Sequence, residues 1–223
     1  MKPFFTIIFS LTLIGNVFSQ DTISWTELNN PTTLLNGRYI ALDLPSIGIT
    51  NGDTTIYPIR SYEIGCFFNG KREGITELYF IGKLSDTLAS RCEYRNDTVL
   101  SSTSFYSNGN PKIINTYFEK QLITTQLYYE QGQKQLDISY IYCKKQYSDY
   151  DALEVSYYKN GIVRYIGKMR STTRSNFGEP YDTWFYYTDC GELYKIEKYK
   201  KRKEKETKEY KIKCEYYEWY DYK

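Results

Sequence analysis

Carboxylates, cysteines and tyrosines are the residues of this chain that could carry chemistry, because its 223-residue sequence has no histidine. Histidine is the commonest general base at neutral pH, so Ser-His-Asp and Cys-His mechanisms are excluded. The sequence also lacks a GxxxxGK[ST] or GxGxxG phosphate-binding loop. Two carboxylates could still hydrolyse a glycoside, but the Asp and Glu residues are scattered as on a solvated face. We therefore predict no catalytic residue, cofactor or metal; a carboxylate-based hydrolase is the least favoured alternative.

Five cysteines are the next candidates, and they contain no CxxC pair that would suggest a zinc cluster. In an oxidising compartment they would form one or two disulfides and leave at least one free thiol. The alternative is that all of them are small buried apolar residues. The pairing stays open among Cys66, Cys92, Cys143, Cys190 and Cys214.

An oxidising compartment is expected because residues 1–19 have the parts of a secretory signal peptide. Lys2 is the charged start, an apolar run follows, and Val17-Phe18-Ser19 precedes the expected cleavage point. The run is shorter than the ~20 residues of a membrane-spanning helix, and no later segment approaches that length. We predict a secreted or periplasmic protein without a transmembrane segment after signal cleavage.

Glycine turns preceded by aromatic pairs recur along the chain and predict how it is organised. Asn-Gly and similar pairs accept the positive φ of a hairpin turn, while aromatic and β-branched residues favour the strands beside it. Residues 122–129, 136–142 and 153–158 are accordingly predicted strands. The turn glycines are Gly70, Gly109, Gly132, Gly161 and Gly191.

The 26 tyrosines suit a thin sheet, because tyrosine buries its ring and keeps its hydroxyl wet. A lone hairpin is marginal in water, so the hairpins must lie side by side and share cross-strand rings. We predict an all-β protein of repeated antiparallel hairpins that form an elongated twisted sheet or a shallow β-solenoid. Its parts are a signal peptide (1–19), an N-terminal β cap or functional module (20–65), hairpin repeats (66–200), and a basic turn with a C-terminal capping strand (201–223).

Two stretches resemble a known family. Residues 178–187 read Gly-Glu-Pro-Tyr-Asp-Thr-Trp-Phe-Tyr-Tyr, and residues 70–74 read Gly-Lys-Arg-Glu-Gly. Both resemble the Gly-Lys-x-x-Gly-x-Trp-x-Tyr-Tyr pattern of the variant MORN-type repeats of bacterial proteins. Asp182 stands at the second glycine of the pattern and Thr76 at its tryptophan. The resemblance implies a scaffold or binding surface without catalytic residues, in a family with antitoxin-like members.

Tyr129, Tyr158 and Tyr187 occupy equivalent places before successive turns and are the candidate binding surface. Exposed rings there could stack on sugars; the alternative is that they hold neighbouring hairpins together. We expect a secreted, non-catalytic protein that presents an extended β surface to a protein or cell-envelope partner. The alternatives are a glycan-binding module and a secreted immunity or antitoxin-like protein.

A basic segment closes the repeats: Lys198–Lys213 holds nine Lys or Arg and three Glu. Such a segment could attract an anionic partner. It could equally be an edge strand whose lysines prevent aggregation, which the interspersed Glu residues favour. Nucleic acid is disfavoured as a partner.

Overall fold

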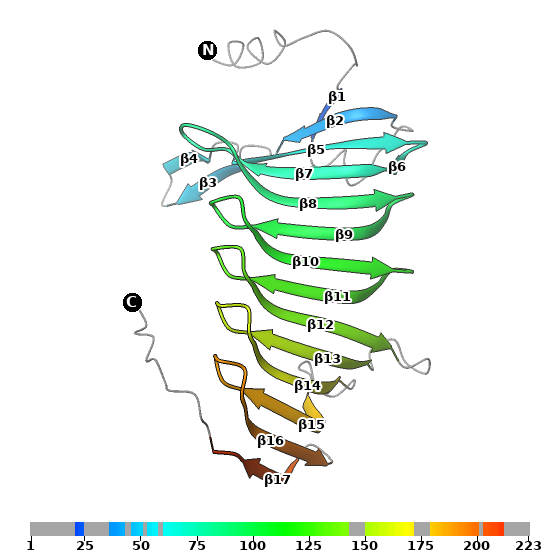
Figure 1. Ribbon diagram of the computed structural model, residues 1–223. Helices are drawn as coiled ribbons and strands as arrows, with labels where there is room; N and C mark the ends of the chain where they lie inside the picture. Colours follow the sequence, from blue (N-terminus) through cyan, green and yellow to red (C-terminus); the bar gives the residue numbers. More distant parts are fainter. Residues whose placement is uncertain are drawn as a thin grey trace.

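The computed structural model describes residues 21–24, 36–42, 46–50, 53–57, 60–142, 150–171, 179–200 and 203–211. Every helix or strand in these ranges is a β-strand (Figure 1), so the prediction of an all-β chain is confirmed. The expected signal peptide, the expected capping strand near the C-terminus, and Cys143 and Cys214 lie outside the described residues.

One open sheet of fifteen strands contains nearly all of these elements, and strands that follow one another in sequence lie side by side (Figure 1). A spacing of about 4.8 Å between strands makes the sheet about 60 Å long across its strands. The strands are β1 (Asp21–Ser24), β2 (Gly37–Leu42), β5 (Ser61–Phe68), β6 (Lys71–Arg72), β7 (Gly74–Phe80), β8 (Thr87–Arg95), β9 (Thr98–Phe105), β10 (Pro111–Phe118), β11 (Gln121–Tyr128), β12 (Lys134–Tyr142), β13 (Tyr150–Tyr157), β14 (Val163–Ser171), β15 (Glu179–Tyr187), β16 (Leu193–Lys200) and β17 (Lys203–Glu209).

The pairing is antiparallel throughout the repeated part, as the hairpin pattern predicts. Among the described strands, β1 alone pairs parallel to its neighbour, which is β2. Two further strands, β3 (Ser46–Thr50) and β4 (Asp53–Tyr57), form a separate antiparallel pair. The three strands predicted at 122–129, 136–142 and 153–158 are β11, β12 and β13, so those predictions are confirmed.

Tight turns of two residues join strands at one edge of the sheet. Asn69-Gly70 joins β5 to β6, Asn96-Asp97 joins β8 to β9, and Glu119-Lys120 joins β10 to β11. All six residues have positive φ, which is the requirement of a type I′ turn and the reason that Asn and Gly are preferred there. Longer turns around Gly109, Gly132, Gly161 and Gly191 lie at the opposite edge, because consecutive strands run in opposite directions (Figure 1).

Cross-strand partners share a face of the sheet, so the register shows which residues lie together. An unbroken row of partners runs from β7 to β14 through Thr76, Cys92, Ser102, Asn115, Thr125, Ile138, Glu154 and Gly167. We call the face that carries this row the buried face. The buried strand residues of the described ranges all lie on it: Tyr39, Ala41, Gly65, Phe67, Thr76, Ala152, Ser156, Gly167, Trp184 and Glu197.

The opposite face, which we call the exposed face, carries the most accessible side chains of the central and C-terminal strands. They include Arg91, Glu93, Phe118, Ile141, Leu153, Lys168, Arg170 and Lys198. Each strand from β8 to β17 makes its substantial contacts with the strands beside it and not with a second layer of described elements. Among the described elements the array is therefore a single layer, and side chains on both of its faces must find burial within that layer.

The Glu119-Lys120 turn yields a stability prediction, because two long side chains there occupy left-handed backbone with φ of 49° and 65°. Replacing them with Asn and Gly (Glu119→Asn, Lys120→Gly) removes this strain and should raise the free energy of unfolding by about 1 kcal/mol. Urea denaturation followed by circular dichroism measures the change. The Glu119→Gln, Lys120→Gln variant is the control, and an equal gain in that variant would contradict the turn-strain explanation.

Candidate interaction surface

Four of the glycine turns have the same backbone hydrogen bonds. The residue three places before the glycine donates its N–H to the carbonyl of the residue just after the glycine, and the glycine N–H donates back to that first residue. The donor–acceptor distances lie between 2.8 and 3.0 Å in all four turns. The turns span 106–110, 129–133, 158–162 and 188–192, and each glycine has positive φ. Gly109, Gly132, Gly161 and Gly191 thus sit where the sequence predicts.

A ladder of tyrosine hydroxyls links these turns to one another. Tyr106 donates to the carbonyl of Tyr128 at 2.8 Å, Tyr129 to that of Tyr157 at 3.2 Å, and Tyr158 to that of Tyr187 at 2.9 Å. In each case the donor is the first residue of one turn, and the acceptor is the residue just before the first residue of the next turn. The hydroxyls therefore fix the spacing and register of successive hairpins.

Asparagine side chains strengthen the same edge. The amide of Asn108 donates to the carbonyl of Glu130, and the amide of Asn160 donates to that of Asp189, both at 2.8 Å. Their Oδ1 atoms also accept the N–H two residues ahead, a local turn that asparagine favours. An asparagine just before the turn glycine thus closes its own turn through Oδ1 and bonds the next turn through its amide N–H.

Two sequence predictions about these turns are corrected. Tyr187 is not equivalent to Tyr129 and Tyr158, because Thr188 makes the backbone hydrogen bonds that the two tyrosines make in their turns. Gly70 does not belong to the same series: its two-residue turn lies at the opposite edge, next to Asn96-Asp97, where the Arg72 N–H donates to Asp97 Oδ1 at 2.6 Å. Counting three residues back from each glycine, rather than aligning aromatic pairs, would have found Tyr106 and Thr188.

The ladder tyrosines are placed as structural groups rather than as open platforms. The hydroxyls of Tyr129 and Tyr158 are engaged, and cations lie over the rings: Lys159 Nζ is 5.9 Å from the centroid of Tyr129 and Arg164 Cζ is 5.9 Å from that of Tyr158. Cation–π contacts of this kind reduce the ring face that a sugar could cover. The geometry favours the alternative that these rings hold hairpins together.

On the buried face, a tryptophan ring lies directly over a glycine. A Cβ built on Gly167 would overlap Trp184 Cδ2, so no other residue fits there without movement. The indole N–H donates to the carbonyl of Lys168 at 3.1 Å, and the side chain is 7% exposed. The ring is buried against the sheet itself, which is how a single layer can bury an aromatic group.

The N-terminal end repeats this arrangement with a different ring. A Cβ on Gly65 would lie 2.6 Å from the hydroxyl oxygen of Tyr39, which is 2% exposed, and 2.7 Å from Thr76 Oγ1. Thr76 occupies the strand position that Trp184 has at the C-terminal end, but its side chain is too small to cover the glycine. Tyr39 on the strand at the other side supplies the ring instead.

Carboxylates on the buried face are held by tyrosine hydroxyls. Tyr186 and Tyr199 donate to Glu197 Oε2 at 2.6 and 2.7 Å, and Lys195 donates to Oε1 at 2.8 Å. Burial by itself raises the pKa of the Glu197 carboxyl, but these three donors outweigh it and hold that pKa below its usual value. Burial and the hydrogen bond to Glu154 raise the pKa of Tyr165 to about 12. Glu197 is thus kept ionised and fully bonded, as expected of a structural carboxylate.

The exposed face between β12 and β17 combines apolar side chains with ion pairs. Ile141 is 66% exposed and Leu153 is 40% exposed. Beside them lie pairs that join neighbouring strands: Arg170 Nε to Asp151 Oδ1 at 2.7 Å, Lys168 Nζ to Asp182 Oδ2 at 2.6 Å, and Lys198 Nζ to Glu206 Oε2 at 3.0 Å. Exposed pairs of this kind stabilise little, so the charges are available for contacts with another molecule.

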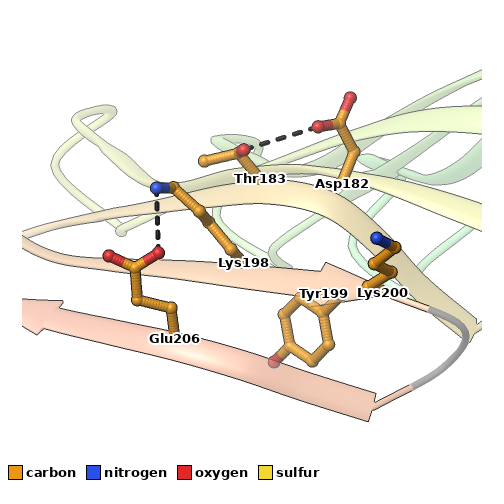
Figure 2. Close-up of a pocket in the computed structure, with 6 residues that line it drawn as sticks. All are labelled: Asp182, Thr183, Lys198, Tyr199, Lys200 and Glu206. Atoms are coloured by element: carbon orange, nitrogen blue, oxygen red, sulfur yellow. Dashed lines mark hydrogen bonds and ion pairs between the residues drawn. The ribbon is translucent and has the colours of Figure 1, made fainter.

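A pocket of about 270 Å³ lies at the C-terminal end of the sheet, between β15, β16 and β17 (Figure 2). Lys198 pairs with Glu206 across its wall and Thr183 Oγ1 lies 3.4 Å from Asp182 Oδ1, while the Tyr199 ring points away from them (Figure 2). Lys200 completes the lining. Four of the six lining residues pair with one another, and the lining includes no nucleophile set against a base, so the pocket is suited to polar anchoring.

The described cysteines differ in chemical state. Cys66 and Cys92 are free thiols, whereas Cys190 is disulfide-bonded. Cys66 pairs in register with Arg38 and Cys92 with Thr76, so the two thiols lie on opposite faces of the sheet. Burial is the largest influence on Cys92 and raises the pKa of its thiol. Cys92 is therefore protonated at neutral pH and is a poor nucleophile.

Cys190 stands in the last turn, where Asn108 and Asn160 stand in earlier ones. The hydroxyl of Thr188 lies 3.0 Å from Cys190 Sγ, and it is the donor because a disulfide sulfur carries no proton. The last turn therefore has a covalent bond at the position where earlier turns have a bridging amide.

Within the described ranges, no group of three or more Cys, Asp or Glu side chains could hold a metal ion. A helix long and apolar enough to cross a membrane is likewise absent from those ranges. No protein-family model matches the chain, and no curated protein matches it either.

Close packing of Trp184 on Gly167 predicts that Gly167→Ala destabilises the protein by about 2 kcal/mol or more, because the added methyl overlaps the indole. The midpoint of urea denaturation, read by tryptophan fluorescence, measures this. Thr183→Ala, beside Trp184 on the exposed face, is the control and should change the free energy of unfolding by no more than about 0.5 kcal/mol. Equal effects of the two changes would show that the ring does not need the glycine.

Loss of one ladder hydroxyl should also be measurable. Tyr158→Phe removes the donor to the Tyr187 carbonyl and leaves that acceptor short of a partner, which costs about 1 kcal/mol. The rate of hydrogen exchange of the N–H groups in β15 and β16 should increase, because the Tyr158 hydroxyl joins the turn between these two strands to the turn at 158–162. Tyr194→Phe is the control, since its hydroxyl is not part of the ladder. Unchanged exchange in Tyr158→Phe would argue against a ladder that couples hairpins.

Proposed function

We propose that this chain is a secreted, non-catalytic binding protein whose hairpin array presents an extended surface to a protein partner. The observation that supports this most directly is the exposed face of β12–β16. It holds uncovered Ile141 and Leu153 between ion-paired charges. Mixed apolar and charged side chains of this kind are the ordinary composition of transient protein interfaces.

The size of this surface is adequate for a specific complex. Five strands of eight or nine residues cover about 700 Å² of sheet at about 3.3 Å per residue and 4.8 Å between strands. A standard interface buries about 800 Å² on each partner. A sheet held by lateral contacts is also rigid before binding, which reduces the entropy lost on association.

The resemblance to variant MORN-type repeats fits the same proposal. At the place of the second glycine of the pattern, Gly74 and Asp182 both have left-handed backbone, with φ of 74° and 63°. At the place of its tryptophan, Thr76 and Trp184 are both buried, and each lies against a glycine of the preceding long strand. The two stretches are thus used alike in the fold, as two copies of one repeat would be.

The proposal is tested by disrupting this part of the exposed face without disturbing the rest. The test variant is Ile141→Lys, Leu153→Glu. The matched control is Phe68→Lys, Ile75→Glu, which changes two apolar side chains that are 63% and 56% exposed at the other end of the same face. Affinity purification of each form from the envelope and secreted fractions, with quantitative mass spectrometry, compares their partners.

A single protein should be enriched by the wild type and by the control, and the test variant should bind it at least about tenfold more weakly. Equal recovery by both variants would place the binding surface elsewhere. Absence of any protein that binds saturably to the purified wild type would overturn the proposal. Circular dichroism and the denaturation midpoint show whether each variant keeps the fold.

A further inference from the structure

The disulfide of Cys190 has a partner that the other cysteines narrow to two residues. The chain has five cysteines, of which Cys190 is disulfide-bonded while Cys66 and Cys92 are free thiols. Cys143 and Cys214 are therefore the two residues that could bond Cys190. Both lie outside the described residues, but the described strands that lead to them decide between the two.

Cys143 directly follows β12, and this strand carries the chain away from the edge of the sheet where Cys190 lies (Figure 1). Through two intervening register partners, Leu136 of β12 is level with Tyr186 of β15. Tyr142 stands six residues beyond Leu136, in the direction opposite to the turn that holds Cys190. Six strand residues extend about 20 Å, whereas the Cα atoms of a disulfide lie within about 7 Å of each other. Cys143 is therefore too far from Cys190.

Cys214 is approached in the opposite way, because β17 carries the chain toward the turn that holds Cys190 (Figure 1). Just after this strand, the Tyr210 N–H donates to the carbonyl of Tyr194 at 2.8 Å, which continues the antiparallel register of β16 and β17. Cys190 is four residues before Tyr194, and Cys214 is four residues after Tyr210. The same register, continued residue for residue, would set the two cysteines opposite each other. Directly opposed residues have Cα atoms about 4.5 to 5.5 Å apart, a separation that a disulfide spans.

We propose that Cys190 and Cys214 form a disulfide that fastens the chain after β17 to the last turn of the array. On formation each thiol gives up one proton and one electron, and the two electrons reduce a disulfide oxidant to two thiols by exchange. Cys66, Cys92 and Cys143 then remain as three thiols. The bond concerns the end of the array, so it does not depend on the partner proposed above.

The position of this bond accounts for the change of residue in the last turn. In earlier turns Asn108 and Asn160 bond the following turn through their amides. Cys190 occupies the same place where the described hairpin turns end. The bond closes a loop over 190–214 that contains β16 and β17. A cross-link over a loop of this size restricts the unfolded chain and favours the folded state by a factor on the order of a hundred.

Peptide mapping of the full chain, produced in an oxidising compartment, tests the pairing. Free thiols are alkylated, the unreduced protein is digested with trypsin, and linked peptides are identified by mass spectrometry. Peptide 175–195 holds Cys190, peptide 214–223 holds Cys214, and peptide 135–144 holds Cys143. We expect 175–195 linked to 214–223 in the wild type and in the Cys143→Ser control, and no such link in Cys214→Ser.

Three results would overturn the pairing: a link from 175–195 to 135–144, an alkylated Cys190 in the wild type, or a link found only in a covalent dimer on non-reducing electrophoresis. The role of the bond is read separately by hydrogen exchange. Cys214→Ser should increase the exchange rate of the N–H groups in β17 at least about tenfold, while Cys143→Ser leaves it unchanged. Equal rates in the two variants would show that the bond does not hold the end of the array.

Discussion

A sheet without a covering layer must obtain its stability from contacts within its own plane, and this constraint explains the unusual composition of the chain. Apolar side chains that rise from a single layer stay in contact with water. Aromatic rings avoid this when they lie along the sheet over a residue without a side chain, as Trp184 does over Gly167 and Tyr39 does over Gly65. Tyrosine suits the remaining positions, because its ring packs sideways on the next strand while its hydroxyl bonds a carbonyl or a carboxylate.

The same constraint explains why the hydrogen bonds that recur between successive hairpins are concentrated in the turns. In a layered protein a second sheet or a helix would fix the spacing of hairpins, whereas here the hydrogen bonds between successive turns fix it. The hydroxyl of Tyr158 and the amide of Asn160 both reach the following turn. Coupling of each unit only to its neighbours is the property of linear repeat proteins, in which the stability is a sum over units and their interfaces.

Local rules made the strands and turns predictable, and the limits of those rules explain what was missed. Glycine spacing placed Gly109, Gly132, Gly161 and Gly191 correctly because positive φ is a requirement of the single residue. The position of Tyr187 was misjudged because an aromatic pair looks the same whichever of its members begins the turn. Pairing of Gly167 with Trp184 could not be read from the sequence, since it depends on register between strands seventeen residues apart. A binding partner is further from reach, because recognition depends on a surface to which many strands contribute.

The ends of the array differ from its middle for a physical reason. A unit within the array is stabilised from both sides, but a terminal unit has one neighbour and must replace the missing contacts. At the last turn Thr188 stands where earlier turns have tyrosine, and disulfide-bonded Cys190 stands where two of them have asparagine. Thr188 has a shorter side chain than tyrosine, and its hydroxyl accepts the Glu192 N–H of its own turn at 3.0 Å. Beyond it, β17 exchanges rings for alternating Lys and Glu. Charged side chains of this kind stay in water and leave little apolar surface on the strand.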